Sequence, residues 1–555
     1  MIKADTVSAF SLQYVESCGI ILPLNHSEEL LIMPKLTFPA FGETDFAEAI
    51  ENPCAKLTVI RGVSEKTYAA YCDLLSTKGF SLSEESRTGA HFFSAFREGS
   101  CAVFLNFYPA LKELYIVAEE DSSYFSYTDT SRDASVLPQI SQISLEDFGM
   151  SYVIRLSDGR FIIIDGGRHF EPDQDRLFKR LRAGSADEKP VIAAWIFTHP
   201  HPDHFYCFVG FVDRYGDQVE IEKFLFNFPM AEDLEHYPGL DFQDHRFTGN
   251  TKPTRYLGLL QERIDRTGAP VYTAHTGQKY RIGDAYCEIL ASMDDAITVD
   301  DNINAASLVI RMELAGQVIL WAADSAFSTV KLVQKHGDYL KADILQIPHH
   351  GFGSGSSDAE IAAYKLIRPR TCLLPVSDYN AYTVFSAFRP GTNFLMDTLP
   401  DVEEVIAGTP QRTITLPYTP PVGAKEKLKN KYLSGRDNCG ARSWIFTELS
   451  TGREEDFQFT LLNTTNSDAT VLIELFFEES FQKIRYIRTA VEAGAIRRVN
   501  IVGKEVNSEW VYFNWLSLKA QGIPENAPFA VRFMSEIPIV VSHRDHTAAY
   551  RSTIQ

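Results

Sequence analysis

The chain of 555 residues lacks paired cysteines, long apolar runs and an excess of positive charge. Its 8 cysteines are scattered without a C-x-x-C pair, which indicates buried thiols in a reducing compartment rather than a disulfide framework. No apolar run approaches the roughly 20 residues that cross a bilayer, and the N-terminus shows no signal-peptide pattern. The net charge of −20 disfavours broad, sequence-independent binding to nucleic acid. We therefore expect a cytoplasmic protein without a membrane partner.

The length predicts two to four domains, because a single core rarely exceeds about 250–300 residues. Residues 1–120 read as a small α+β domain to which we assign no function, and the polar stretch 119–137 reads as a linker. Strands alternate with helices over 138–420. After a charged, proline-led linker, residues 440–555 show short strands typical of a β-sandwich, two of them expected at 529–535 and 539–542.

The densest pattern is H-x-H-x-D-H, which follows the apolar strand-like run 191–197. Pro200 and Pro202 argue against a regular helix directly after that strand, so we expect the pattern on a strand-end loop. Imidazole nitrogen and carboxylate oxygen are ligands that Zn²⁺ and related cations prefer. A polar loop that happens to contain histidines is the alternative, but chance should produce the pattern in fewer than about one in a thousand such chains. The predicted ligands are His199, His201, Asp203 and His204.

Further polar residues stand at the ends of three predicted strands. Asp165 follows a predicted hairpin and precedes a Gly-Gly turn, and Asp324 ends the apolar run 317–324. His349, His350 and Gly351 follow the run 343–348. Another strand is expected to open at residue 302. A strand-end turn residue is the alternative for Asp324, and a turn cap is the alternative for Asp165.

Taken in order, these residues resemble the metallo-β-lactamase superfamily, over roughly residues 140–420. The resemblance implies an αββα sandwich, within an α/β (α+β) chain, and a metal site at one edge of two packed sheets. The entry to the strand at 302–307 and the His-His-Gly turn followed by Gly353 to Ser357 look most like one branch. That branch includes the hydrolase domain of bacterial DNA-uptake proteins and phosphorylcholine esterases.

The resemblance implies a role for each matched residue. His199 and His201 would bind a first metal, Asp203 and His204 a second, and Asp324 would bridge both. His349 or His350 would complete the second site, and Asp165 would orient the histidine loop through hydrogen bonds. The family's additional first-site histidine has no clear counterpart, since His236, His245 and His275 are all candidates. Ala323 stands where the family usually has glycine.

The implied chemistry is hydrolysis by a hydroxide held between two divalent cations, Zn²⁺ first and Mn²⁺ or Fe as alternatives. Asp203 would bind metal and orient the attacking water, which makes it the predicted catalytic residue. A small anionic or phosphoester substrate is expected, with Gly351, Ser354 and Ser356 as candidate donors to it. Hydrolysis of a lactam or thioester is the alternative, because the same nucleophile attacks carbonyls.

The C-terminal part resembles the sensory rhodopsin transducer family over about residues 440–550. The matching segments are Leu461 to Thr465, Ile473 to Phe477 and Ile537 to His543. The resemblance implies a compact β-sandwich through which the protein forms homo-oligomers. A non-catalytic binding or signalling protein with a structural metal site is therefore the rival to the enzyme.

Overall fold

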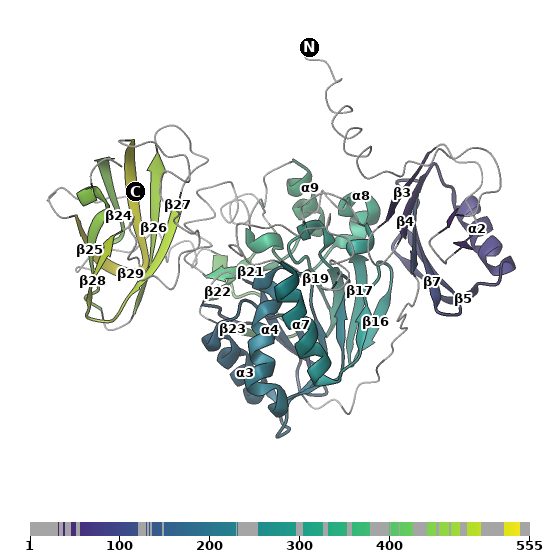
Figure 1. Cartoon of the computed structure of the whole chain (residues 1–555), viewed down its shortest axis with the longest axis horizontal. Coiled ribbons are helices and arrows are strands. Elements are labelled where there is room, and N and C mark those ends of the chain that lie inside the picture. The colour runs from purple at the N-terminus through teal and green to yellow at the C-terminus, as the bar shows by residue number, and fades with distance from the viewer. Residues whose placement is uncertain are drawn as a thin grey trace, which may run out of the picture.

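The computed structural model describes most of the chain after Lys56 and little before it. The described residues are 31–32, 37–38, 46–51, 56–119, 129, 133, 136–146, 149–228, 230, 253–295, 303–325, 331–351, 358–377, 399, 401–409, 411–425, 441–450, 454–465, 468–477, 485–500 and 527–543. Figure 1 shows an N-terminal sheet with one helix, a central α/β part and a C-terminal β part.

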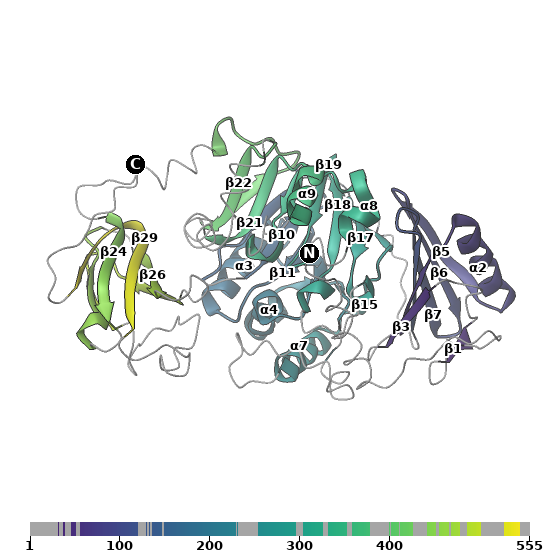
Figure 2. The ribbon, with the colours of Figure 1, turned by 90° about the horizontal axis from the view of Figure 1, so that it is seen from above.

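Two sheets lie face to face in the central part, with helices on both outer faces (Figure 2). The first sheet contains β9 (Gln139–Gln142), β10 (Ser151–Arg155), β11 (Phe161–Asp165), β12 (Val191–Ile196), β13 (Glu220–Ile221), β14 (Phe224–Phe226), β15 (Val271–Thr273) and β23 (Arg412–Thr415). The second contains β16 (Lys279–Ile282), β17 (Ala285–Ala291), β18 (Val309–Leu314), β19 (Gln317–Trp321), β20 (Ile344–Gln346), β21 (Thr371–Ser377) and β22 (Glu404–Thr409). The helices are α3 (Glu171–Gly184), α4 (Pro202–Tyr215) and α7 (Pro253–Thr267) on the first sheet, and α8 (Leu332–His336) and α9 (Asp358–Ile367) on the second.

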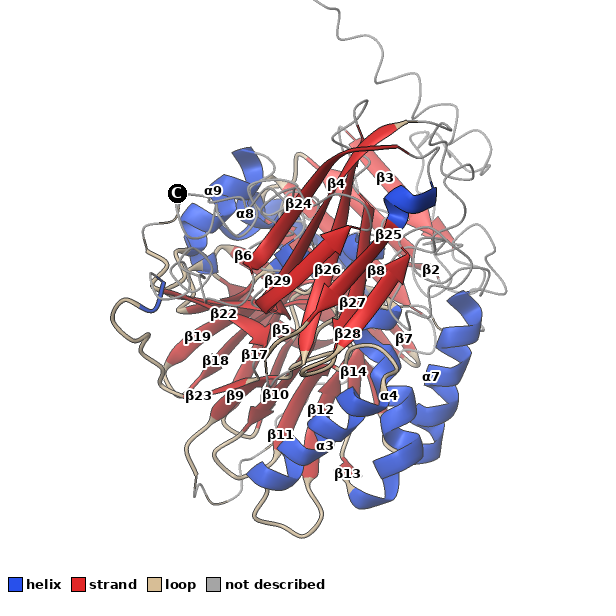
Figure 3. Ribbon diagram, turned by 90° about the vertical axis from the view of Figure 1, so that its left-hand side faces the viewer, coloured by secondary structure: helices blue, strands red, loops and turns tan. Residues whose placement is uncertain are grey.

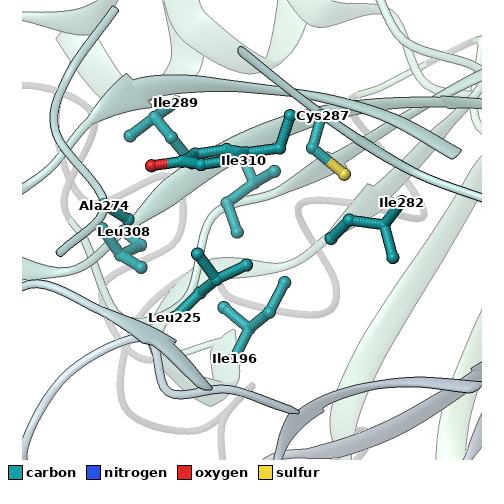
Figure 4. Close-up of a pocket in the computed structure, with 9 residues that line it drawn as sticks. Ile196, Leu225, Ala274, Ile282, Cys287, Ile289, Leu308 and Ile310 are labelled. Carbon is teal, nitrogen blue, oxygen red and sulfur yellow. The ribbon is translucent and has the colours of Figure 1, made fainter. Parts of the chain in front are cut away.

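These layers confirm the predicted αββα fold class, with the strands inside and the helices outside (Figure 3). Apolar side chains from both sheets meet between them, and the ring centroids of Tyr152 and Trp321 lie 5.0 Å apart in this layer. Figure 4 shows a small space in the same core, lined by apolar side chains and Tyr280. Because its lining is almost wholly apolar, this space does not suit an anionic substrate.

The strand directions bring the predicted ligands to one edge of the sandwich. In the first sheet β11 and β12 are parallel, so Asp165 and the histidine segment leave at the same end. In the second sheet β19 and β20 are parallel, so Asp324 and the His-His-Gly turn also leave together. Ligands bind at the carboxyl ends of parallel strands in open α/β sheets, and this edge is therefore the expected place for a site.

Two local predictions in this region are wrong. The segment Ile303–Ala306 forms a 3₁₀ turn, called η4, and the strand begins only at Val309. The histidine pattern is not wholly a loop, because α4 begins at Pro202 and carries Asp203 and His204 in its first turn. Proline at the first helical position lacks only an N–H that would have no partner there, so Pro202 starts this helix rather than preventing it.

The N-terminal sheet contains β3 (Phe46–Glu51), β4 (Lys56–Arg61), β5 (Ser81–Thr88), β6 (His91–Glu98), β7 (Cys101–Tyr108) and β8 (Glu113–Glu119), and a separate pair consists of β1 (Leu31–Ile32) and β2 (Thr37–Phe38). Helix α2 (Glu65–Thr77) packs on one face, and the Ser64 hydroxyl accepts a hydrogen bond from the Thr67 N–H at 3.1 Å as an N-cap. Strand β5 was not predicted, since its sequence SLSEESRT is mostly polar and its side chains are largely exposed.

The C-terminal part contains β24 (Ala441–Ser450), β25 (Gln458–Leu462), β26 (Ala469–Phe477), β27 (Arg485–Val491), β28 (Ile496–Asn500) and β29 (Pro528–His543). The prediction of two strands after residue 528 is wrong, because β29 is one strand of 16 residues. β29 pairs with β24 and β26 mainly through its first half and with β25 through its second half, so one strand takes part in three ladders. Among the described residues, no helix is long and apolar enough to cross a membrane.

Candidate metal centre

Six of the predicted ligands form two adjacent groups at the edge where β11, β12, β19 and β20 end. Within each group the potential ligand atoms lie within 4.8 Å of one another. The first group is His199, His201 and Asp324, and the second is Asp203, His204 and His350. Five of the six side chains are buried, and His201 is partly exposed, so the groups open toward solvent on its side.

Asp324 lies between the two groups. Its Oδ2 is 3.6 Å from His199 Nε2 in the first group and 3.2 Å from His204 Nε2 in the second. The same oxygen is 3.4 Å from His350 Nε2. A carboxylate in contact with both sets has the position that a bridging ligand needs.

Asp165 and Thr198 fix the orientation of His204. Both oxygens of the fully buried Asp165 carboxylate accept hydrogen bonds: Oδ1 from the Thr198 N–H at 2.8 Å, and Oδ2 from the Thr198 hydroxyl at 2.7 Å. The His204 Nδ1 lies 2.7 Å from Oδ2, and donation from Nδ1 leaves His204 Nε2 as the ligand atom. A carboxylate behind a metal-binding imidazole is a frequent device that sets its tautomer.

The backbone under the first turn of α4 is held by two neighbouring loops. Met150 N–H donates to Asp203 O at 3.1 Å, and Gly167 N–H donates to His204 O at 3.1 Å. A Cβ at Gly149 would lie 2.6 Å from Asp203 O, so only glycine fits that approach. Gly149 could not be predicted from the sequence, because an isolated glycine before a strand carries no signal of what lies beside it.

Gln346 holds the loop that carries Asp324. Its Oε1 accepts from the N–H groups of Ala322 and Ala323 at 2.8 and 2.6 Å, and its Nε2 donates to Ala323 O at 3.1 Å. Ala323 has φ 49, in the left-handed region that glycine adopts most easily, which explains why glycine is usual at this position. Gln346, a polar residue inside an apolar strand, was not predicted from the sequence either.

The charges of the two groups depend on each other. Burial disfavours charge on His204, but the carboxylates of Asp324 and Asp165 outweigh it and raise the pKa of His204 well above its usual value. At His350 the same balance, with Asp324 and Asp203 as the carboxylates, raises the pKa to about 9. Conversely, burial would raise the pKa of Asp324, but His204 and His350 hold it well below the usual value. The carboxylates thus favour positive charge here, and a bound cation would replace these protons.

The structure separates the two neighbouring histidines of the His-His-Gly turn. His350 is buried and its Nε2 lies 3.4 Å from Asp203 Oδ2, so it belongs to the second group. His349 belongs to neither group; its side chain is 39% exposed and its Nε2 is 4.0 Å from Asp324 Oδ2. Burial lowers the pKa of His349 below the usual value.

Of the three candidates for an additional first-site histidine, only His275 lies within the described residues. Its Nδ1 is 3.0 Å from Asp294 Oδ2 and its Nε2 is 3.2 Å from Glu119 Oε2, so both ring nitrogens face carboxylates of another cluster. His275 is therefore not a ligand of the first group. His236 and His245 lie outside the described residues, as do the candidate substrate donors Ser354 and Ser356.

The residues fit divalent cations. The ligand set is imidazole and carboxylate without thiolate, which suits Zn²⁺, Mn²⁺ or Fe. Asp324 Oδ1 is buried and has no hydrogen-bond partner among the described residues, and a buried carboxylate oxygen normally has one. Cys207, near the site in sequence, is buried with its thiol pKa raised well above the usual value by that burial, and it suits packing rather than metal binding.

Comparison with known proteins supports the same assignment for part of the chain. Residues 145–290 match the family model of the Metallo-beta-lactamase superfamily. No curated protein matches the chain.

Several solved structures are similar to parts of the chain. Human tRNase Z, short form, covers 50% of this chain and 100% of its own at 14% identity and a TM-score of 0.28. A B3 metallo-β-lactamase with an active-site glutamic acid covers 53% and 86% at 16% identity and a TM-score of 0.22. The Anabaena sensory rhodopsin transducer covers 20% and 100% at 23% identity and a TM-score of 0.15.

The family match includes Asp165 and the cluster from His199 to His204, and it ends before Asp324 and the His-His-Gly turn. The fold and the two ligand groups extend the assignment to those later residues by position in space. Within residues 145–290 the chain carries a metallo-β-lactamase superfamily domain.

Proposed function

We propose that the protein is a metal-dependent hydrolase that uses two divalent cations and acts on a phosphoester. The observation that carries the proposal is the pair of adjacent His/Asp groups joined by Asp324. When bound by these residues, two divalent cations would supply a lowered water pKa and Lewis acidity for hydrolysis. The superfamily domain supports a metal-dependent hydrolase in general and does not select the substrate.

The protein residues have separate tasks in this proposal. His199, His201 and Asp324 would hold one cation, and Asp203, His204 and His350 the other. Asp203 would also orient the attacking water, since its carboxylate is nearly buried among imidazoles and stays ionised, with its pKa held far below the usual value. Asp165 and Thr198 would keep the His204 ring in place while charge develops on the substrate.

A phosphoester suits this arrangement better than a carbonyl substrate. The two ligand groups would hold two neighbouring cations, and a phosphate group offers two non-bridging oxygens for such a pair where a carbonyl group offers one. Gly351 follows the second-group ligand His350 with φ 88, which turns the chain at the edge of the site. Lactam or thioester hydrolysis is the alternative chemistry, and a non-catalytic binding protein is the alternative class.

The first test counts metal atoms per chain by elemental analysis of protein never exposed to chelator. Close to two per chain, together with hydrolysis of bis(p-nitrophenyl) phosphate, is expected. Hydrolysis of a thioester or nitrocefin in place of the phosphodiester would assign the site to carbonyl chemistry. One metal or none, with no hydrolysis of any of these, would favour a binding protein.

A further inference from the structure

A polar pair outside both ligand groups lies beside the metal centre. Asn304 stands in η4, just before β18, and the Leu308 N–H donates to Thr198 O at 2.9 Å, which ties this segment to the histidine pattern. From there Asn304 Nδ2 lies 3.4 Å from His349 Nε2. Residues 45 positions apart therefore meet at the mouth of the site.

Asn304 has an unused polar atom. Its Oδ1 is buried and has no hydrogen-bond partner among the described residues. If the amide were turned, the oxygen would face His349 and the NH₂ group would be the atom left over. Within the described part of the chain, either orientation leaves one hydrogen-bonding atom of the amide without a partner, and burial of such an atom costs free energy unless something binds it.

His349 is held in a conformation that points to a task beyond packing. It has φ 48, the left-handed region that a histidine rarely adopts, and its N–H donates to Ala323 O at 2.9 Å. Its side chain is 39% exposed while that of the neighbouring His350 is 1% exposed. The turn thus directs one histidine into the ligand group and leaves the other between that group and solvent.

We propose that Asn304 and His349 form a subsite that holds one oxygen of the phosphoester substrate next to the two cations. The inference rests on the proposed function and adds to it which residues position the substrate. An amide and an imidazole suit a single oxygen with partial negative charge, whereas a further whole phosphate usually draws Arg or Lys. Asn304 and His349 would contact substrate directly and bind no metal.

The test uses the full-length metal-loaded protein and two variants, Asn304→Ala and His349→Asn. Asparagine tolerates the left-handed backbone of residue 349 better than most residues but does not reach as far as histidine. We expect unchanged metal content and unchanged thermal unfolding. Binding of inorganic phosphate, measured by isothermal titration calorimetry, should weaken about tenfold in each variant, the loss typical of one hydrogen bond to a charged acceptor.

The double variant and a control complete the design. Because the two side chains would hold the same oxygen, the double variant should lose less than the product of the single losses. His169→Ala, at an exposed histidine that is in neither ligand group, should bind phosphate as the unchanged protein does. The kcat/KM for bis(p-nitrophenyl) phosphate should fall with phosphate affinity in the two variants only.

Each outcome has a separate meaning. Unchanged phosphate affinity and kcat/KM in both variants, with an active parent protein, would overturn the subsite alone. Loss of metal from either variant would also overturn it, because that residue would then be a ligand. A parent protein that holds metal but neither binds phosphate nor cleaves the phosphodiester would overturn the proposed function and the subsite with it. Should one variant fail to fold, the other decides.

Discussion

Asp203 is the residue whose change should separate catalysis from folding. Its carboxylate contacts His350 at 3.4 Å, and its position in the first turn of α4 is set by backbone bonds from neighbouring loops. Asp203→Asn keeps the shape of the side chain but removes the charge that, in the proposed function, would bind the cation and orient water. We expect turnover to be abolished, with circular dichroism and thermal unfolding of the protein close to those of the parent.

An exposed carboxylate gives the control for this change. Asp187 lies between α3 and β12 with an exposed side chain, and Asp187→Asn should leave turnover unaltered. Turnover by Asp203→Asn at the parental rate would rule out the role assigned to Asp203.

Asp165 should affect metal affinity although it is not expected to touch metal. One carboxylate oxygen of Asp165 accepts from the Thr198 hydroxyl and faces His204 Nδ1. Asp165→Asn puts an amide in place of this carboxylate, and the amide makes weaker and more directional hydrogen bonds. Changes to groups that orient metal-binding histidines typically cost about 10–100-fold in affinity. Competition with a chromogenic chelator should show a loss of this size, while the Asp187→Asn variant keeps the parental affinity. Equal affinity in both variants would mean that Asp165 only caps a turn.

At the scale of single elements, the loop between β19 and Asp324 depends on Gln346. Gln346→Met keeps the side-chain volume but leaves the N–H groups of Ala322 and Ala323 buried without an acceptor. Unsatisfied buried groups cost about 1–3 kcal/mol each, so losing the acceptor of both N–H groups should lower the free energy of unfolding by roughly 2–6 kcal/mol. Metal content should fall too, because the loop positions Asp324.

The other end of β19 provides a matched control. Gln317 makes a similar pair of bonds, with its Oε1 accepting from the Tyr418 N–H at 2.6 Å and its Nε2 donating to Tyr418 O at 2.9 Å. Gln317→Met should lower the free energy of unfolding without lowering the metal content. Urea unfolding and elemental analysis measure both quantities. If the two variants lose the same free energy of unfolding and the same amount of metal, Gln346 has no special role at the site.

Individual elements also show how far the sequence could predict the structure. The apolar runs predicted β12, β19 and β20, and their ends predicted where ligands would gather, because burial dictates apolar composition. The start of α4 was misjudged, since Pro202 ends a helix only from an interior position. The choice between His349 and His350 could not be predicted either. It depends on two consecutive left-handed residues, with φ 48 and φ 52, which no periodicity reveals.

Across the whole molecule, the N-terminal sheet and the central domain share a continuous core. Buried apolar side chains of the N-terminal strands pack in one cluster with those of the first central sheet, so this sheet is not a separately packed unit on that side. A buried charge also contacts the N-terminal sheet: Lys335 Nζ of α8, which pairs with Asp295 Oδ1 at 2.5 Å, lies 4.7 Å from the ring centroid of Tyr108 in β7. The sequence predicted a domain boundary near residue 120. The position of a boundary along the chain does not predict contacts between the parts on either side of it.

His275 makes the stability of this junction depend on pH. It stacks on Phe104 of β7 at 3.8 Å between ring centroids and lies between Asp294 of the 3₁₀ turn Met293–Asp295 and Glu119 at the end of β8. Burial would lower the pKa of His275, but Glu119 and Asp294 raise it to about 10 from an ordinary value of 6.5. A raised pKa in the folded state gives stability that is complete below about pH 6.5 and is lost as pH rises through about 10.

The variant His275→Gln should therefore be less stable than the parent by an amount that shrinks as pH rises. Without the imidazolium, two carboxylates remain buried together, so the deficit in free energy of unfolding near pH 7 should be on the order of a few kcal/mol. Above about pH 10 the parent has lost the same charge and the difference should nearly vanish. His336→Gln is the matched control, because burial lowers the pKa of His336 to about 4 and keeps it neutral throughout this range. Urea unfolding of the parent and both variants from about pH 7 to 10.5 checks this prediction. If the loss of unfolding free energy in His275→Gln does not change with pH, as expected for His336→Gln, then His275 is neutral at the junction.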